Sequence, residues 1–166
     1  MKNGIDLQEI RNFVDTLSDA TKIYVGCDSE RFRIDGVWHA KYIKVVVVHI
    51  DGNHGCRMYG ETTVERDYDK KVARPAYRMM QEVYKVAELY LKLAPMFDDR
   101  EIEIHLDINP NLLHGSSCVV DQAIGYIKGT CNVVPMVKPK AWAGSYCADR
   151  YESIMTLVNS KKRKAV

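Results

Sequence analysis

The chain has 166 residues, of which 46% are hydrophobic and 28% charged, and a formal net charge of +2. A chain of this length and apolar content can build one domain with a buried core, which excludes a disordered protein. The weak positive charge does not by itself require a polyanionic partner.

Five cysteines are scattered along the chain without a Cys-x-x-Cys pair. Structural zinc needs clustered ligands, so this spacing disfavours a zinc site and indicates a reduced, cytoplasmic protein. No apolar run approaches the roughly 20 residues needed to cross a bilayer. We therefore expect no association with a membrane.

The first half of the chain predicts one helix and three strands. Residues 6–17 have apolar side chains at helical spacing, which indicates a leading helix within a segment 1–20. Three runs rich in β-branched residues follow, and a glycine-rich turn at 51–55 joins the last two as a hairpin. We expect an antiparallel meander with strands at 22–27, 37–50 and 56–64.

The second half alternates helices and strands. A long apolar stripe predicts a helix, with Pro75 in its first turn. Ser116 or Ser117 is a suitable N-cap for a shorter helix that Gly129 would end. Pro135 indicates an edge position or a bulge in the last strand. The expected elements are helices at 70–94, 116–128 and 145–159 and strands at 101–108 and 131–137.

This order predicts an α/β domain over residues 21–160. A meander followed by strand–helix alternation gives a five-stranded mixed sheet with helices on both faces, because right-handed crossovers place the last two strands parallel to the first. This is the ribonuclease H arrangement. The last residues, 161–166, include the basic run "KKRK" and are expected to form a frayed, solvated tail.

Two predicted strands each end on an acid, Asp28 in "IYVGCDSE" and Asp107 in "IEIHLDIN". If these strands are parallel neighbours, both carboxylates emerge at the edge where open α/β sheets bind ligands. Magnesium takes oxygen ligands and is held by one or two carboxylates together with substrate phosphate. We therefore predict a site for Mg²⁺ or Mn²⁺ at Asp28 and Asp107, with two ions about 4 Å apart.

Such a site needs further acids, which the helices would supply. On the long helix, Glu88 lies far from the apolar stripe, whereas Glu82 lies at its flank, so Glu82 is the candidate ligand. Its structural alternative is a surface ion pair with Arg78 or Lys85. Asp149 lies in the first turns of the last helix, off its apolar stripe, and is the fourth candidate metal ligand. Its structural alternative is an acid that interacts favourably with the helix dipole.

Two lysines flank the loop before the last helix. Lys138 and Lys140 lie near the predicted site and are candidates for binding a phosphate backbone, although loop lysines are usually only solvated. Trp142 would stack on a base or, more in keeping with large aromatics, fill the space between the last helix and the sheet.

Three other polar residues have structural interpretations. His105 is expected to be a hydrogen-bonded core histidine and Asn109 a turn-forming residue in "NPN". His114 lies in a loop where a mobile histidine would assist catalysis, but a lone loop histidine is more often incidental. None of the three is a predicted catalytic residue.

Four ordered motifs between Lys22 and Arg150 resemble those of the YkuK-type, ribonuclease H-like family of bacteria and phages. The resemblance implies a retroviral-integrase-like fold with an acidic metal site. It carries over Asp28, Asp107 and Asp149 by motif and Glu82 by position on the long helix. The motifs are "YVGCDS" (24–29), "IHLDIN" (104–109), "GYIKG" (125–129) and "KPKAWAGSYCAD" (138–149).

Two functions are compatible with the sequence. The first is a metal-dependent nuclease acting on RNA, an RNA/DNA hybrid or structured DNA, with resolvase-like or general nuclease activity equally open. The second is a non-catalytic scaffold that binds nucleic acid or a protein partner, because a fold does not determine a function. The oligomeric state is not predicted.

Overall fold

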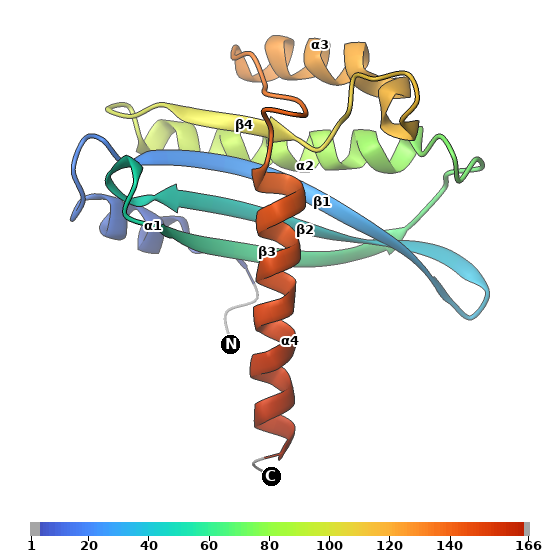
Figure 1. Cartoon of the computed structure of the whole chain (residues 1–166), viewed down its shortest axis with the longest axis horizontal. Coiled ribbons are helices and arrows are strands. Elements are labelled where there is room, and N and C mark those ends of the chain that lie inside the picture. The colour runs from blue at the N-terminus through green and yellow to red at the C-terminus, as the bar shows by residue number, and fades with distance from the viewer. Residues whose placement is uncertain (1–3, 165–166) are drawn as a thin grey trace.

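A computed structural model describes the backbone of residues 4–164 and the side chains of residues 4–156 and 159. A single twisted sheet with strand order β3-β2-β1-β4 lies at its centre (Figure 1). The first three strands are antiparallel and β4 is parallel to β1, as the sequence predicts. The strands are β1 (Lys22–Ile34), β2 (Val37–His49), β3 (Cys56–Arg66) and β4 (Ile102–Leu106).

The prediction of a fifth strand at 131–137 is wrong, because the sheet in the described residues has four strands. Only Met136 pairs with β4, in a parallel bridge opposite His105, where its N–H donates to Ile104 O at 2.8 Å. Pro135 has no N–H, so the ladder cannot continue through it. The segment thus takes the expected place beside β4 without forming a strand.

Strand β1 continues well beyond its predicted end at Cys27. It pairs with β2 as far as Ile34↔Val37, and the two-residue turn Asp35–Gly36 has positive φ at both positions, 48° and 79°. Asp-Gly favours this hairpin turn, a signal that the strand pattern alone overlooked. Asp28 therefore lies within β1, not at its end.

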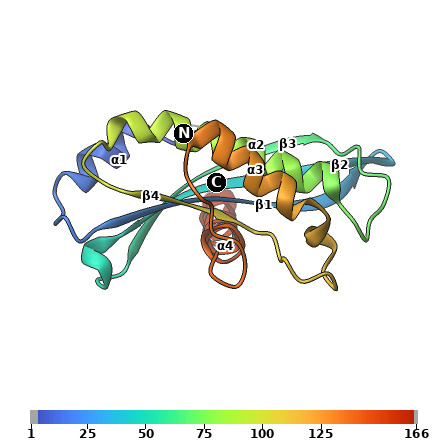
Figure 2. The same cartoon turned by 90° about the horizontal axis from the view of Figure 1, so that it is seen from above.

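Helices cover both faces of the sheet, as predicted (Figure 2). Three pack on one face with the larger apolar core, and the fourth lies on the other face behind a π-helical turn, Ala143–Cys147. The helices are α1 (Leu7–Val14), α2 (Ala76–Leu93), α3 (Val120–Cys131) and α4 (Ala148–Lys164).

The bounds of all four helices differ from those expected. A 3₁₀ turn, Gly115–Val119, precedes α3, and Ser116 accepts the Asn109 N–H with its hydroxyl instead of capping the helix. The helix passes through Gly129 and ends at Asn132, whose φ of 57° is the left-handed conformation that asparagine tolerates. Helix α2 begins at Ala76, not at residue 70, and Pro75 is its N-cap residue, next to the first turn where it was expected.

The leading helix shares the core of the domain, because Ile10 and Val14 are fully buried in the same apolar cluster as α2 and the sheet. At the other end of the chain, α4 is helical as far as Lys164, so a frayed tail from residue 161 is not observed. Residues 165–166 and the side chains of 160–164 lie outside the described part of the structure.

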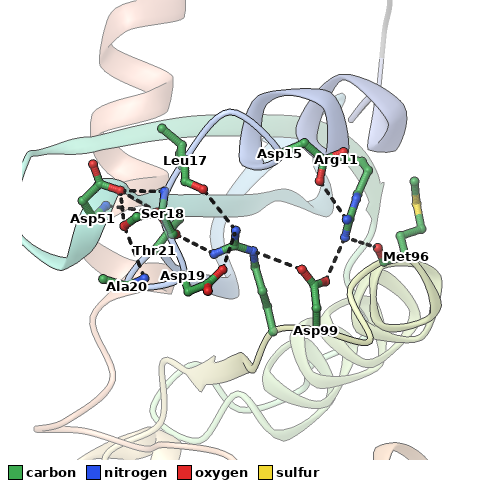
Figure 3. A network of polar contacts seen from close by, with 11 residues as sticks. Arg11, Asp15, Leu17, Ser18, Asp19, Ala20, Thr21, Asp51, Met96 and Asp99 are labelled. Carbon is green, nitrogen blue, oxygen red and sulfur yellow. Dashed lines mark hydrogen bonds and ion pairs between the residues drawn. The ribbon is translucent and has the colours of Figure 1, made fainter.

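A polar network fixes the end of the sheet where β1 and β4 begin (Figure 3). Arg11 of α1 donates to Met96 O at 2.7 Å and to Asp99 at 3.0 Å, joining α1 to the α2–β4 connection. Asp51 accepts the N–H and hydroxyl of Ser18 at 3.0 and 2.6 Å. Because the predicted acidic site lies at the opposite end of β4, this network is structural.

None of the helices within residues 4–164 has the length and apolar character needed to span a membrane.

Candidate active site

Asp28 and Asp107 lie side by side where β1 and β4 separate. The last pair between these strands is Cys27↔Leu106, so the two aspartates are the next residues on each chain. Strand alternation points both toward the face that carries α4. Burial, followed by the charge of Asp107, raises the pKa of Asp28 from 3.8 to about 7. The sheet therefore holds two carboxylates at the distance where they repel.

Glu82 of α2 joins this pair from the opposite face of the sheet. Its side chain is buried, with 3% exposed, and the Ser29 hydroxyl donates a short hydrogen bond to Oε1. Arg78 donates to Ser29 O and Oγ at 2.7 and 2.8 Å, which fixes the serine. Burial and then the charge of Asp28 raise the pKa of Glu82 well above its ordinary value.

The surface alternative for Glu82 is wrong. Lys85 forms its ion pair with Glu65, and Arg78 turns to Ser29. Glu88 instead faces solvent, with 61% of its side chain exposed, and pairs with Lys92. The helical periodicity thus selected the glutamate that points into the protein.

Asp149 lies in the first turn of α4 and is exposed, as the sequence predicts. Its charge also raises the pKa of Asp28, so the two carboxylates interact, but Asp149 stays outside the buried group. The start of α4 reaches the sheet because Gly144 packs against β1: a Cβ there would lie 2.8 Å from Cys27 O and 3.4 Å from the Asp107 Cβ. Sequence reasoning overlooked this glycine, and Gly26 opposite it, although a glycine within a strand signals close backbone approach.

His105 is a hydrogen-bonded core histidine, as expected. Its Nδ1 accepts the backbone N–H groups of Trp142 and Ala143 at 3.3 and 3.2 Å. Burial lowers the pKa of His105, which favours the neutral ring that such an acceptor requires, with the proton on Nε2 toward Glu103. The histidine thereby anchors the segment that leads into α4.

Trp142 fills the space between that segment and the sheet. Its ring packs against Tyr24 and His105, with centroid distances of 4.8 and 5.3 Å. This confirms the structural interpretation over a base-stacking platform. Asn109 is confirmed as a turn-forming residue, because its side chain accepts the Asn111 N–H at 2.9 Å, and His114 lies exposed in the same loop.

The two candidate lysines differ in their surroundings. The Lys138 ammonium forms a close ion pair with Asp107 Oδ1, and the Lys138 N–H donates to Ile108 O at 3.0 Å. Lys140 is exposed. The structure therefore brings Lys138, but not Lys140, into contact with a predicted metal ligand.

The acids fit a divalent cation only in part. Within the described residues, no three His, Cys, Asp or Glu side chains gather as a group that would hold a metal ion. Glu82 accepts a hydrogen bond from Ser29, and Asp107 forms an ion pair with Lys138, so both carboxylates already have partners. The adjacent carboxylates of Asp28 and Asp107 nevertheless provide the hard oxygen donors that Mg²⁺ takes, two from protein and the others from water and phosphate.

The sequence pattern of the family described as Ribonuclease H-like matches residues 6–153, which is most of the chain. The protein belongs to the Ribonuclease H-like family. The resemblance to YkuK-type proteins is confirmed by this match. No curated protein and no solved structure matches the chain. The Ribonuclease H-like family is associated with nucleic acid, as nuclease or as scaffold, and membership alone does not choose between the two.

Proposed function

We propose that this Ribonuclease H-like protein is a metal-dependent nuclease that hydrolyses phosphodiester bonds of RNA, an RNA/DNA hybrid or structured DNA. One observation carries the proposal: Asp28 and Asp107 are adjacent and largely buried, and burial, followed by the charge of Asp107, raises the pKa of Asp28 to about 7. A buried pair of like charges is unfavourable for folding. A bound cation would remove this repulsion.

In this proposal Asp28 and Asp107 hold Mg²⁺ or Mn²⁺, and Glu82 and Asp149 complete the ligand set for two ions. Such ions, when bound, would supply activation of a water molecule and charge stabilisation for an in-line displacement at phosphorus. Lys138 and Lys140 would bind the phosphate backbone as point charges.

Other residues would keep the ligands in position. Arg78 and Ser29 hold Glu82 at the sheet, which supports a defined carboxylate geometry. His105 accepts two backbone N–H groups just before the π-helical turn, and so holds the start of α4 and with it Asp149. A rigid arrangement of this kind is what metal-dependent hydrolysis requires from the protein.

The second candidate is a non-catalytic scaffold that binds nucleic acid or a protein partner. It is favoured by the ion pair between Lys138 and Asp107, which already neutralises one acid, and by the lack of a three-ligand group within residues 4–164. The nuclease is the better proposal because the scaffold needs neither Asp28 nor Glu82 to be buried beside Asp107.

The test is a cleavage assay on labelled single-stranded and duplex RNA and DNA, an RNA/DNA hybrid and a four-way junction. Each substrate is incubated in Mn²⁺ and in chelator with the parent, Asp107→Asn and, as a matched control, Asp121→Asn on the exposed side of α3. We expect cleavage that requires Mn²⁺ and is lost only in Asp107→Asn. Cleavage that survives this substitution would exclude the mechanism, and no cleavage of any substrate would favour the scaffold.

A further inference from the structure

Lys138 contacts one of the carboxylate oxygens of Asp107, a proposed metal ligand. Oδ1 of Asp107 is buried, and the contact described for it is the ion pair with the Lys138 ammonium. The Asp107 side chain is 13% exposed. Lys138 therefore supplies the positive charge that a partly buried carboxylate needs.

The backbone of Lys138 is held by a hydrogen bond, whereas its side chain is partly exposed to solvent. Its N–H donates to Ile108 O at 3.0 Å, directly after the Met136 bridge, so the Cα is fixed beside the end of β4. Its side chain is 37% exposed and carries the charge on a flexible four-carbon stem. The ammonium can consequently leave Asp107 for solvent or for a phosphate without movement of the backbone.

We propose that Lys138 is a built-in counter-ion that competes with the divalent cation for Asp107 and is displaced when the cation binds. The inference rests on the proposed metal site. Two cations cannot both contact the same carboxylate oxygen without strong repulsion. Once displaced from Asp107, the Lys138 ammonium would be free to bind the phosphate backbone of a substrate beside the metal site. Lys138 would in this way couple metal binding to substrate binding.

A purely structural role for Lys138 makes the opposite prediction. If the ion pair served to hold Asp107 ready for the metal, removal of the ammonium would leave the carboxylate misplaced and weaken metal binding. If Lys138 acted only through its long-range charge, removal of any nearby lysine would have a similar effect. Lys140, two residues away and exposed, is the matched control for this second possibility.

The experiment is a calorimetric titration of the full chain with Mn²⁺, using Lys138→Met, Lys138→Arg and Lys140→Met beside the parent. We expect Lys138→Met to bind Mn²⁺ about tenfold more tightly or better, because the competing cation is gone. Lys138→Arg should stay close to the parent, and Lys140→Met should change the affinity by no more than about twofold, because its charge is screened by solvent. The gain should vanish in the double variant Lys138→Met/Asp107→Asn.

The outcomes separate this inference from the proposed function. Mn²⁺ binding by Lys138→Met but not by the parent would support competition in its strongest form. Equal or weaker binding by Lys138→Met, or an equal gain in Lys140→Met, would overturn the inference while leaving the metal site intact. If neither the parent nor Lys138→Met binds Mn²⁺, both the inference and the metal-dependent nuclease are wrong.

A second titration tests the released ammonium with a fluorescent single-stranded DNA oligonucleotide. In Ca²⁺ we expect Lys138→Met to bind the oligonucleotide more weakly than the parent does. The salt dependence of oligonucleotide affinity should fall by the equivalent of about one phosphate contact. In chelator the parent's Lys138 is engaged with Asp107, so the substitution should have little effect. An equal effect in both conditions would contradict displacement by the metal.

Discussion

Gly26 of β1 and Gly144 of the π-helical turn are in backbone contact. A Cβ on Gly26 would lie 2.6 Å from the Gly144 nitrogen, and a Cβ on Gly144 would lie 2.8 Å from Cys27 O. Such separations leave no room for a side chain on either residue. This contact sets the height at which α4 begins above the sheet, and hence the place of Asp149 beside Asp28.

We expect Gly144→Ala to destabilise the protein by about 1–3 kcal/mol, as overpacking does, because the new methyl group meets the backbone of β1. Gly125→Ala is the control, because nothing lies within 4 Å of its position on α3 and alanine favours a helix over glycine by about 1 kcal/mol. Urea unfolding measures both variants. The contact would not be needed if Gly144→Ala were as stable as the parent.

The raised pKa of Asp28 predicts that the metal-free protein is less stable at neutral pH than at acid pH. The folded state keeps a proton between pH 3.8 and about 7 that the unfolded state has lost, so stability falls as the pH rises through this window. Asn resembles the protonated acid and can still accept the Ser29 N–H, which donates to Asp28 at 2.8 Å. We expect Asp28→Asn to be more stable than the parent by a clearly smaller margin at pH 5 than at pH 8, where the gain reaches at most on the order of 4 kcal/mol.

Urea unfolding in chelator at both pH values tests this prediction. The comparison with the variant at each pH also cancels His105, whose lowered pKa acts in the opposite direction by removing stability as the pH falls below 6.5. Asp121→Asn, which alters an exposed acid, should show the same difference from the parent at pH 5 and pH 8. An equal gain for Asp28→Asn at both pH values would mean that Asp28 is ionised throughout.

Loss of the His105 ring should loosen the segment that leads into α4. In His105→Leu the N–H groups of Trp142 and Ala143 lose their acceptor, and a buried unpaired group destabilises by about 1–3 kcal/mol. His114→Leu, in an exposed loop, should change stability by less than about 0.5 kcal/mol. Thermal unfolding gives the comparison, and the near-ultraviolet signal of Trp142 should weaken only in His105→Leu. Equal stability of the two variants would exclude an anchoring role.

Substitution of Glu82 should reduce metal binding without reducing the stability of the metal-free protein. Glu82→Gln keeps the shape of the side chain, its amide oxygen can still accept from Ser29, and it carries no buried charge, so it should unfold near the parent's temperature in chelator. Mn²⁺ should raise the melting temperature of the parent and of Glu88→Gln, because a ligand that binds the native state stabilises it, but should raise that of Glu82→Gln much less. An undiminished Mn²⁺ effect in Glu82→Gln would remove Glu82 from the ligand set.

The sequence by itself predicted the meander, the parallel fourth strand, helices on both faces and the pairing of Asp28 with Asp107. These features follow from local periodicity and from the handedness of crossovers, which act within or between neighbouring elements. The helical repeat also predicted that Glu88 faces solvent and that Glu82 lies nearer the apolar stripe, but it left a surface ion pair of Glu82 open, and only the structure shows that Glu82 is buried.

Only the tertiary structure decided the features that depend on contacts between distant segments. The contact of Gly26 with Gly144, the hydrogen bond from Ser29 to Glu82 and the ion pair of Lys138 with Asp107 each join residues far apart in the chain. No periodicity encodes such contacts, because they depend on how two surfaces meet once the elements have packed. The same reason explains why a strand expected at 131–137 became a single bridge: Pro135 removes one donor, and pairing then depends on the fit against β4.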